Sequence, residues 1–187
     1  MIYTAITGNK DALRDDVKCF TKDLWFTSNP LMTAKAYKVL PHLFLSDKWT
    51  VWIDGNIRLF IDEEELIEMT KPFEVGVFAH PERNCIYSEG AFCKKMGKGN
   101  PFEIDRQLKD YKDAGYLLDN GLAACFIIVR KNTSYVNRLN EIWWEHITKY
   151  SKRDQISFPI IFNGHFKYLP KVSMKRNKYF ERFKHKN

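Results

Sequence analysis

The sequence predicts a single α/β domain in which helices flank a mixed, mostly parallel sheet. Short apolar runs alternate with amphipathic stretches along the chain, which is typical of layered α/β proteins. A length of 187 residues with 44% apolar content supports one hydrophobic core and is too short for two ordinary domains. The 14 Phe, 9 Tyr and 5 Trp exclude a disordered chain.

Five apolar, β-rich runs predict strands. Each run is bounded by turn residues or by charged groups, as in Thr7-Gly8-Asn9 after the first run. The third run, Thr50-Val51-Trp52-Ile53, is apolar throughout, which is typical of a strand covered on both faces. In chain order, the predicted strands are residues 2–6, 17–20, 50–53, 75–79 and 123–129.

Helices are predicted between these runs from capping residues and from apolar spacings of three and four. Lys35 and Lys38 are three residues apart and share a helix face. The predicted helices are a short one at residues 11–16, one capped by Thr33 and ended by Pro41, one capped by Asp62, one opened by Asn100-Pro101, and a long one at residues 132–150.

Composition also indicates the cellular setting. The first residues carry no apolar signal-peptide core, and no run is long enough to span a membrane, so we expect a cytoplasmic protein. The four Cys residues form no C-x-x-C pair and no Cys/His cluster, which disfavours disulfides and structural zinc.

Most of the net charge of +7 comes from the C-terminus. Residues 171–187 contain seven Lys and Arg against Glu181 alone, interleaved with Tyr179, Phe180 and Phe183. We therefore divide the chain into a domain at residues 1–170 and a basic tail at residues 171–187. Such a tail can bind nucleic acid, an anionic membrane surface or a phosphorylated ligand, or can only add solubility.

Several enzyme classes lack their motifs here. The sequence contains no G-x-G-x-x-G after the first strand, no G-x-x-x-x-G-K-[ST] and no G-x-S-x-G. This disfavours dinucleotide enzymes, P-loop nucleotidases and serine hydrolases.

The segment W-I-D-G-N-I follows the third predicted strand. In an extended segment Asp54 and Asn56 project to the same side, while Gly55 keeps the backbone low between them. Oxygen ligands of this kind suit Mg²⁺ or Mn²⁺ together with substrate phosphates. The alternative is that D-G-N is only a turn.

Three further polar clusters border apolar runs. His80 and Arg83 follow the fourth strand and suit phosphate or sugar hydroxyl groups. The other two clusters are Asp119-Asn120-Gly121, before the fifth strand, and Arg153-Asp154-Gln155, before the apolar run ISFPII.

Together these residues resemble a known family. The resemblance is carried by K-V-L-P-H-L-F (38–44), V-W-I-D-G-N-I (51–57), H-P-E-R-N-C-I-Y-S-E (80–89), Gln107, Tyr111 and Gly115, N-G-L (120–122), and R-D-Q-I-S-F (153–158). The chain is similar over residues 1–162 to the glycosyltransferase-like domain of plant mucilage-related and turgor-regulation proteins. That domain is a branch of the GT-A nucleotide-sugar transferases, and we expect a bacterial or viral member of it.

The resemblance implies a GT-A-like, Rossmann-like fold and a role for each cluster. Asp54 begins the equivalent of the D-x-D metal motif, with Asn56 and His165 as further ligands of Mn²⁺ or Mg²⁺. The implied substrate-binding residues are Gly8 at the nucleotide base, Lys38 and His42 at the phosphates, His80 and Arg83 at the sugars, and Asp119, Asn120, Asp154 and Gln155 on the acceptor side.

The leading hypothesis is therefore metal-assisted transfer of a sugar from a nucleotide diphosphate sugar to a hydroxyl acceptor such as a glycan. Asp54 and Asp154 are its catalytic candidates, with Asp154 favoured over Asp119 as the acceptor-side carboxylate. The alternative is a non-catalytic module on the same fold that binds glycan or nucleic acid, favoured by Asn56 in place of Asp. A metal-dependent phosphoesterase or nucleotidyltransferase ranks lower, because the candidate carboxylates are scattered one per cluster.

Overall fold

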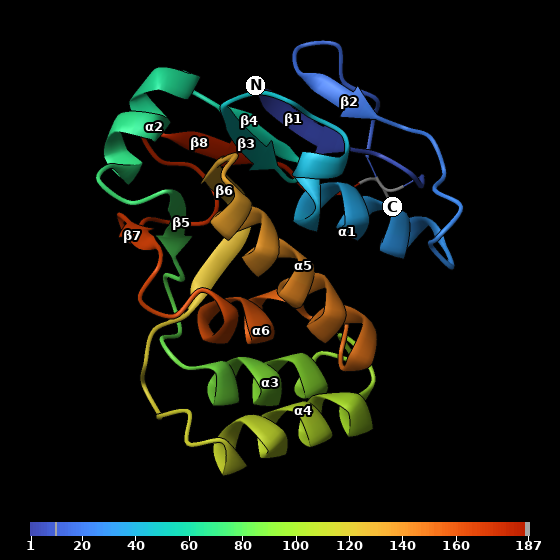
Figure 1. The fold of residues 1–187 in the computed structure, drawn as a ribbon, viewed down its shortest axis with the longest axis vertical. Coiled ribbons are helices and arrows are strands. Elements are labelled where there is room, and N and C mark those ends of the chain that lie inside the picture. The colour runs from blue at the N-terminus through green and yellow to red at the C-terminus, as the bar shows by residue number, and fades with distance from the viewer. Residues whose placement is uncertain (10, 186–187) are drawn as a thin grey trace.

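A six-stranded sheet runs through the protein in the order β2-β1-β3-β6-β5-β7 (Figure 1). The computed structural model describes residues 1–9 and 11–185. The sheet strands are β1 (Ile2–Ala5), β2 (Lys18–Phe20), β3 (Trp49–Ile53), β5 (Val75–Ala79), β6 (Ala123–Lys131) and β7 (Lys167–Leu169). All five strands predicted from the sequence are confirmed within two residues at each end.

The directions of the strands determine which strand ends lie at the same edge of the sheet. β6 pairs antiparallel with both β3 and β5, and the other three pairings in the sheet are parallel. Five strands therefore point the same way, as the prediction of a mixed, mostly parallel sheet requires. The carboxyl ends of β1, β3 and β5 lie at the same edge as the beginning of β6. We call this edge the carboxyl edge of the sheet.

Both faces of the sheet are covered, which explains why its central strands are apolar throughout. Trp52 packs on one face with the helices α1 (Pro30–Val39), α5 (Ser134–Lys149) and α6 (Asp154–Ile161). Its neighbours Val51 and Ile53 point to the other face. There they meet α2 (Glu63–Thr70) and a small second sheet of β4 (Ile57–Leu59) and β8 (Phe180–Arg182).

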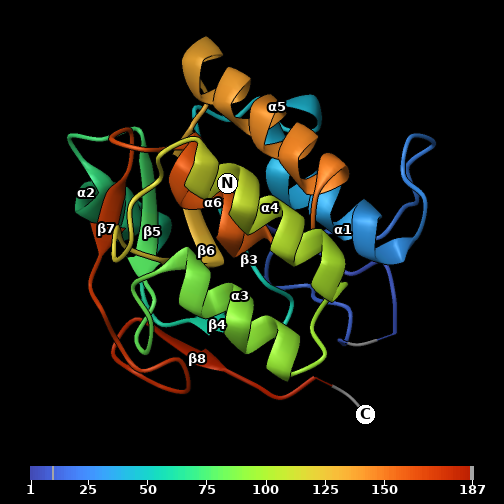
Figure 2. The ribbon, with the colours of Figure 1, turned by 90° about the horizontal axis from the view of Figure 1, so that it is seen from below.

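The remaining two helices form a separate layer. Helix α3 (Ile86–Lys95) packs on both α4 (Pro101–Asp113) and α6, and Figures 1 and 2 show α3 and α4 beyond α6 from the sheet. A Cβ at Gly90 of α3 would lie 2.5 Å from Leu108 Cδ1, so this glycine permits the close approach of α4. Among the described residues, none of the helices combines the length and the apolar character needed to cross a bilayer.

The helix predictions had mixed outcomes. Asp62 accepts a hydrogen bond from the Glu65 amide, and Asn100 caps α4, so both predicted caps are confirmed. The cap predicted at Thr33 is wrong, because α1 begins earlier and Asn29 accepts from the Met32 amide. The short helix predicted at residues 11–16 does not form in the described residues, and a bent loop takes its place. The run ISFPII lies in a helix, α6.

The segment after residue 170 packs against the domain. Phe180 of β8 is fully buried and Tyr179 is 7% exposed, in the core between the small sheet and the main sheet. Arg176 pairs with Glu181, the only acidic residue of the segment. The boundary that we placed at residue 170 therefore separates residues that pack together.

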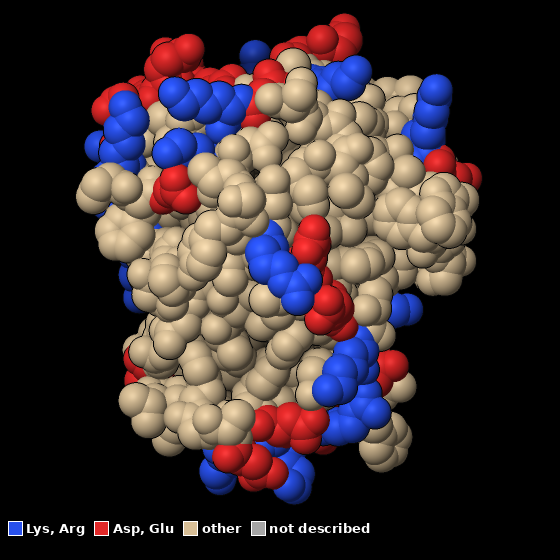
Figure 3. Space-filling model, viewed as in Figure 1, with Lys and Arg blue, Asp and Glu red and all other residues tan. Residues whose placement is uncertain are grey.

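On the face shown in Figure 3, Lys and Arg stand beside Asp and Glu and form no single basic patch. Binding of an anionic surface by this segment stays a prediction, and residues 186–187 lie outside the described residues.

This packing predicts that the C-terminal segment stabilises the domain. Replacing Phe180 with Ala should lower the free energy of unfolding by about 3–5 kcal/mol, because a fully buried aromatic ring leaves a cavity. Phe183, three residues later, is 48% exposed, and Phe183→Ala serves as the matched control with a smaller loss. Urea denaturation measures both. Equal stability of the two variants would show that residues 179–183 do not pack as described.

Candidate functional site

The polar clusters predicted from the sequence meet at the carboxyl edge of the sheet. Gly8 follows β1, Asp54 follows β3, His80 follows β5, and Asn120 precedes β6. Backbone hydrogen bonds hold two of these ends together, from the Asp54 amide to Phe126 and from the His80 amide to Leu122, at 2.8 Å each. The strand ends of an α/β sheet are a common place for ligand binding.

The centre of this edge is a chain of ion pairs between α1, β3 and α6. The Lys38 ammonium lies 2.6 Å from Asp154 Oδ2 and 3.3 Å from Asp54 Oδ1. The Lys35 ammonium lies 3.5 Å from Asp154 Oδ1. We call Lys35, Lys38, Asp54 and Asp154 the lysine–aspartate cluster. Two of its members, Asp54 and Asp154, were the predicted catalytic residues, and Lys38 was predicted at the phosphates.

Local geometry explains why these side chains converge. The beginning of α1 is tied to the carboxyl edge, because the Thr7 hydroxyl donates to the Pro30 carbonyl at 2.6 Å. Side chains on a helix tilt toward its N-terminus, so Lys35 and Lys38, on one face of α1, extend toward that edge. The spacing of three residues predicted that the two lysines share one helix face, but Lys35 was not predicted as a site residue.

Trp52 is a second residue that the sequence reasoning left out. It lies two positions before Asp54 on the same side of the strand, and its indole Nε1 donates to Asp54 Oδ1 at 2.9 Å. The spacing of two residues between Trp52 and Asp54 in a strand was the sequence signal that could have placed Trp52 in the site. This bond and the contact with Lys38 orient the Asp54 carboxylate, whose side chain is one third exposed.

Burial and charge together set the protonation of the cluster. Burial would raise the pKa of Asp154, but Lys35, Lys38 and Arg153 outweigh it and hold that pKa well below its usual range. Burial would lower the pKa of Lys38, but Asp154 and Asp54 raise it above its usual value. A carboxylate held so firmly in its ionised form is a poor proton acceptor at neutral pH. Asp154 is thus better suited to fixing the lysines than to acting as a base.

A second buried network lies beside this cluster. Glu89 of α3 is 2% exposed and accepts from Arg83 Nε at 2.7 Å, with Arg153 Nη2 3.7 Å away. The Arg83 guanidinium also stacks on the Phe92 ring at 4.0 Å. Glu89 thereby contacts Arg83, from the loop after β5, and Arg153, the residue before Asp154. Glu89 is the last residue of the H-P-E-R-N-C-I-Y-S-E motif at 80–89, but it was not predicted as a site residue.

His80 is enclosed by donors. Its Nδ1 atom lies 3.2 Å from the Glu82 amide nitrogen and 3.1 Å from that of Arg83, and its Nε2 atom lies 3.0 Å from Arg83 Nη2. Burial and the Arg83 charge lower the pKa of His80 below its usual value, although Glu89 opposes this. The ring is therefore neutral at physiological pH.

The His80 environment predicts a pH effect on stability. Because the pKa is lower in the folded protein, the unfolded chain binds more protons just below pH 6.5, so stability should fall as the pH drops through that value. Urea denaturation at pH 7.5 and pH 5.5 measures the difference. His80→Asn should reduce it, and an unchanged difference would contradict a neutral, buried His80.

The turn after β3 separates Asp54 from Asn56. The Ile57 amide donates to the Asp54 carbonyl at 2.9 Å, which closes a β-turn over residues 54–57. Asn56 therefore points away from the lysine–aspartate cluster. Its Nδ2 donates to the Phe183 carbonyl at 2.7 Å, and its Oδ1 is buried without a partner among the described residues. The expectation that Asp54 and Asn56 aim at one point fails because the strand ends at Ile53.

Two predicted histidines lie at the opposite edge of the sheet. His42 lines a small cavity with Thr50 near the beginning of β3 and with Arg130 near the end of β6. His165 precedes β7, and its ring packs on Tyr135 at the beginning of α5. The structure therefore brings neither histidine together with Asp54.

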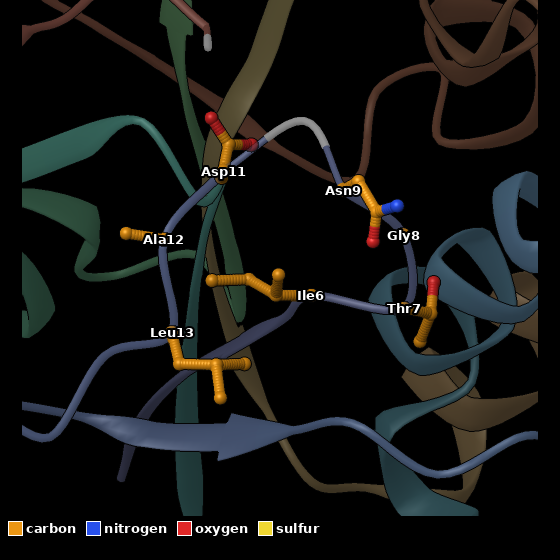
Figure 4. Close-up of a pocket in the computed structure, with 7 residues that line it drawn as sticks. All are labelled: Ile6, Thr7, Gly8, Asn9, Asp11, Ala12 and Leu13. Carbon is orange, nitrogen blue, oxygen red and sulfur yellow. The ribbon is translucent and has the colours of Figure 1, made fainter.

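The other predicted residues border the carboxyl edge. Gln155 Nε2 donates to the Ala123 carbonyl at 3.0 Å, which ties α6 to β6. Asp119 and Asn120 are exposed, and Asp119 has a φ of 52°, in the left-handed region common in turns. Gly8 lines a pocket of about 520 Å³ after β1, into which the Ile6 side chain points (Figure 4). Its other described lining residues are Thr7, Asn9, Asp11, Ala12 and Leu13.

The predicted metal ligands do not fit a divalent ion. Asp54 Oδ1 already faces the Trp52 and Lys38 donors, Asn56 points toward Phe183, and His165 lies at the other edge. Asp11 and His185 lie near the turn, but they pair with each other at 2.9 Å. Within residues 1–9 and 11–185, no three His, Cys, Asp or Glu side chains are grouped to hold a metal ion.

Comparison with known families identifies the domain. Residues 19–186 match the family described as TOD1/MUCI70, glycosyltransferase-like domain. The chain belongs to this family. The match includes most of the segment after residue 170, in agreement with its packing against the TOD1/MUCI70 domain. It also includes all four members of the lysine–aspartate cluster.

A relative of known sequence supports the same assignment. The probable hexosyltransferase MUCI70 of Arabidopsis thaliana is 25% identical over 139 residues. The match covers 68% of this chain and 24% of that protein, so the chain spans about a quarter of the length of its relative. No solved structure matches this TOD1/MUCI70 domain significantly.

Proposed function

We propose that this protein transfers a glycosyl group from a nucleoside diphosphate sugar to a hydroxyl acceptor at the lysine–aspartate cluster. Membership of a glycosyltransferase-like family supports the class of reaction. The observation that carries the assignment of the site is the convergence of Lys38, Asp54 and Asp154 at the carboxyl edge, 2.6–3.3 Å apart. The GT-A-like character of the fold and the nucleotide-sugar donor are parts of this proposal.

The chemistry sets what the site must do. The bond between the anomeric carbon and a diphosphate oxygen breaks, and the acceptor oxygen forms the new bond to that carbon. Negative charge grows on the departing diphosphate, so a fixed positive charge nearby lowers the barrier. The Lys38 ammonium is held in place by two carboxylates before the donor binds, and it therefore needs little reorganisation during the reaction.

The pocket after β1 suits the nucleoside part of the donor. Its volume lies within the range of small-molecule sites, and Ile6 supplies an apolar contact beside polar groups of Thr7 and Asn9. The Thr7 hydroxyl contacts the beginning of α1, the helix that carries Lys38. A nucleobase in this pocket and a diphosphate at Lys38 would therefore be bound by neighbouring segments of the chain.

The acceptor proton needs a destination. In the cluster Asp154 is a poor base, as described above, which favours transfer of that proton to the leaving diphosphate oxygen on the same face of the sugar. The product should then retain the anomeric configuration of the donor. NMR of the product decides this, and an inverted configuration would require a base other than Asp154.

The proposed activity is tested by incubating the protein with UDP-sugars and GDP-sugars and a panel of glycan acceptors. We expect release of nucleoside diphosphate together with a glycosylated product for one donor and acceptor pair. The alternative of a non-catalytic glycan-binding module predicts acceptor binding without release of nucleoside diphosphate. Failure of every donor to bind, in the presence or absence of Mn²⁺, would contradict the proposed function.

A further inference from the structure

The lysine–aspartate cluster carries no excess of negative charge. Lys35 and Lys38 balance the two carboxylates Asp54 and Asp154, so the formal charge of the cluster is zero. Beside it, Glu89 is shared by Arg83 and Arg153, and Arg83 also pairs with Glu82. A binding site for a divalent cation needs an excess of negative oxygen ligands. This site has no such excess, because both carboxylates are already paired with lysine ammonium groups.

The position of the Lys38 ammonium strengthens this point. The side chain is 8% exposed, lies within 3.3 Å of both carboxylates, and sits 5.7 Å from the centre of the Trp52 ring. A divalent ion bound to Asp54 Oδ1 would have to displace both this ammonium and the Trp52 indole N–H. An ammonium has three donor hydrogens, and two carboxylates engage two of them, which leaves one for an incoming phosphate oxygen.

We propose that the Lys38 ammonium takes the place of a divalent cation, so that the diphosphate of the donor binds and departs without Mn²⁺ or Mg²⁺. This inference rests on the proposed function and concerns how the same site handles negative charge. Asp54 and Asp154 fix the ammonium from two sides, and Lys35 adds a second positive charge from the preceding turn of α1.

The test measures binding of UDP and GDP to the intact protein by calorimetry, first with EDTA and then with excess Mn²⁺. The nucleotide that binds should do so with the same affinity, within about threefold, under both conditions. Lys38→Met, which keeps the length of the side chain and removes its charge, should weaken binding by about tenfold or more. Lys109→Met, at an exposed lysine of α4, is the matched control and should bind as the wild type does.

The possible outcomes separate this inference from the proposed function. Binding that needs Mn²⁺, or Mn²⁺ held by the protein alone in an electron paramagnetic resonance titration, would overturn the role of Lys38 and leave glycosyl transfer standing. Absence of UDP and GDP binding under both conditions would overturn both. The comparison of EDTA with Mn²⁺ uses the wild-type protein, so it decides the question even where Lys38→Met does not fold. Lys38→Arg keeps the charge and should bind more tightly than Lys38→Met.

Discussion

Asp154→Asn should destabilise the protein by about 3–5 kcal/mol, the usual cost of removing one partner from a buried ion pair. The side chain is 9% exposed and lies within 3.5 Å of the Lys35 and Lys38 ammonium groups. Without its charge, two lysines stay at the carboxyl edge with only the partly exposed Asp54 opposite them. Chemical denaturation in urea measures the loss of stability.

The same substitution should also reduce the rate of transfer. The freed lysines are no longer fixed, so we expect turnover of the Asp154→Asn protein to fall by about a hundredfold at a temperature where it stays folded. Asp113→Asn is the control variant. It removes an exposed carboxylate that pairs with Lys109 on α4, and a surface pair of this kind contributes less than about 1 kcal/mol to stability. Similar stabilities of the two variants would show that Asp154 is not buried among cations.

Asp54→Ala should reduce turnover by about a hundredfold or more while leaving the fold intact, because Asp54 orients Lys38 but is itself partly exposed. Trp52 Nε1 loses its acceptor in this variant, so a small loss of stability should accompany the loss of turnover. Steady-state rates with the active donor and acceptor provide the measurement. Asp15→Ala, at an exposed carboxylate of the loop before β2, is the control. Wild-type turnover of Asp54→Ala would remove Asp54 from the site.

The sheet was predictable because its evidence is local. A strand covered on both faces must be apolar at consecutive positions, and residues 50–53 and 123–129 show this directly. The caps at Asp62 and Asn100 were predictable for the same reason, since each side chain bonds an amide two or three residues away. The helix expected at residues 11–16 failed because D-A-L-R-D-D has no apolar face to pack.

The site was predictable only in part because its geometry depends on distant segments. Asn56 is held by Phe183, which lies 127 residues further along the chain, and no local pattern indicates that contact. Nothing near His42 or His165 in the sequence tells which edge of the sheet each will reach. The charge of residues 171–187 suggested a solvated tail, whereas the aromatic pair Tyr179-Phe180 was the signal for packing.

A structure determined after soaking with the nucleoside diphosphate that binds, in EDTA, tests the central claim most directly. We predict that a phosphate oxygen lies within hydrogen-bond distance of the Lys38 ammonium, at the carboxyl edge between β1 and β3, with the base in the pocket after β1. A diphosphate bound elsewhere, with Lys38 still enclosed by its two carboxylates, would contradict the assignment of the site.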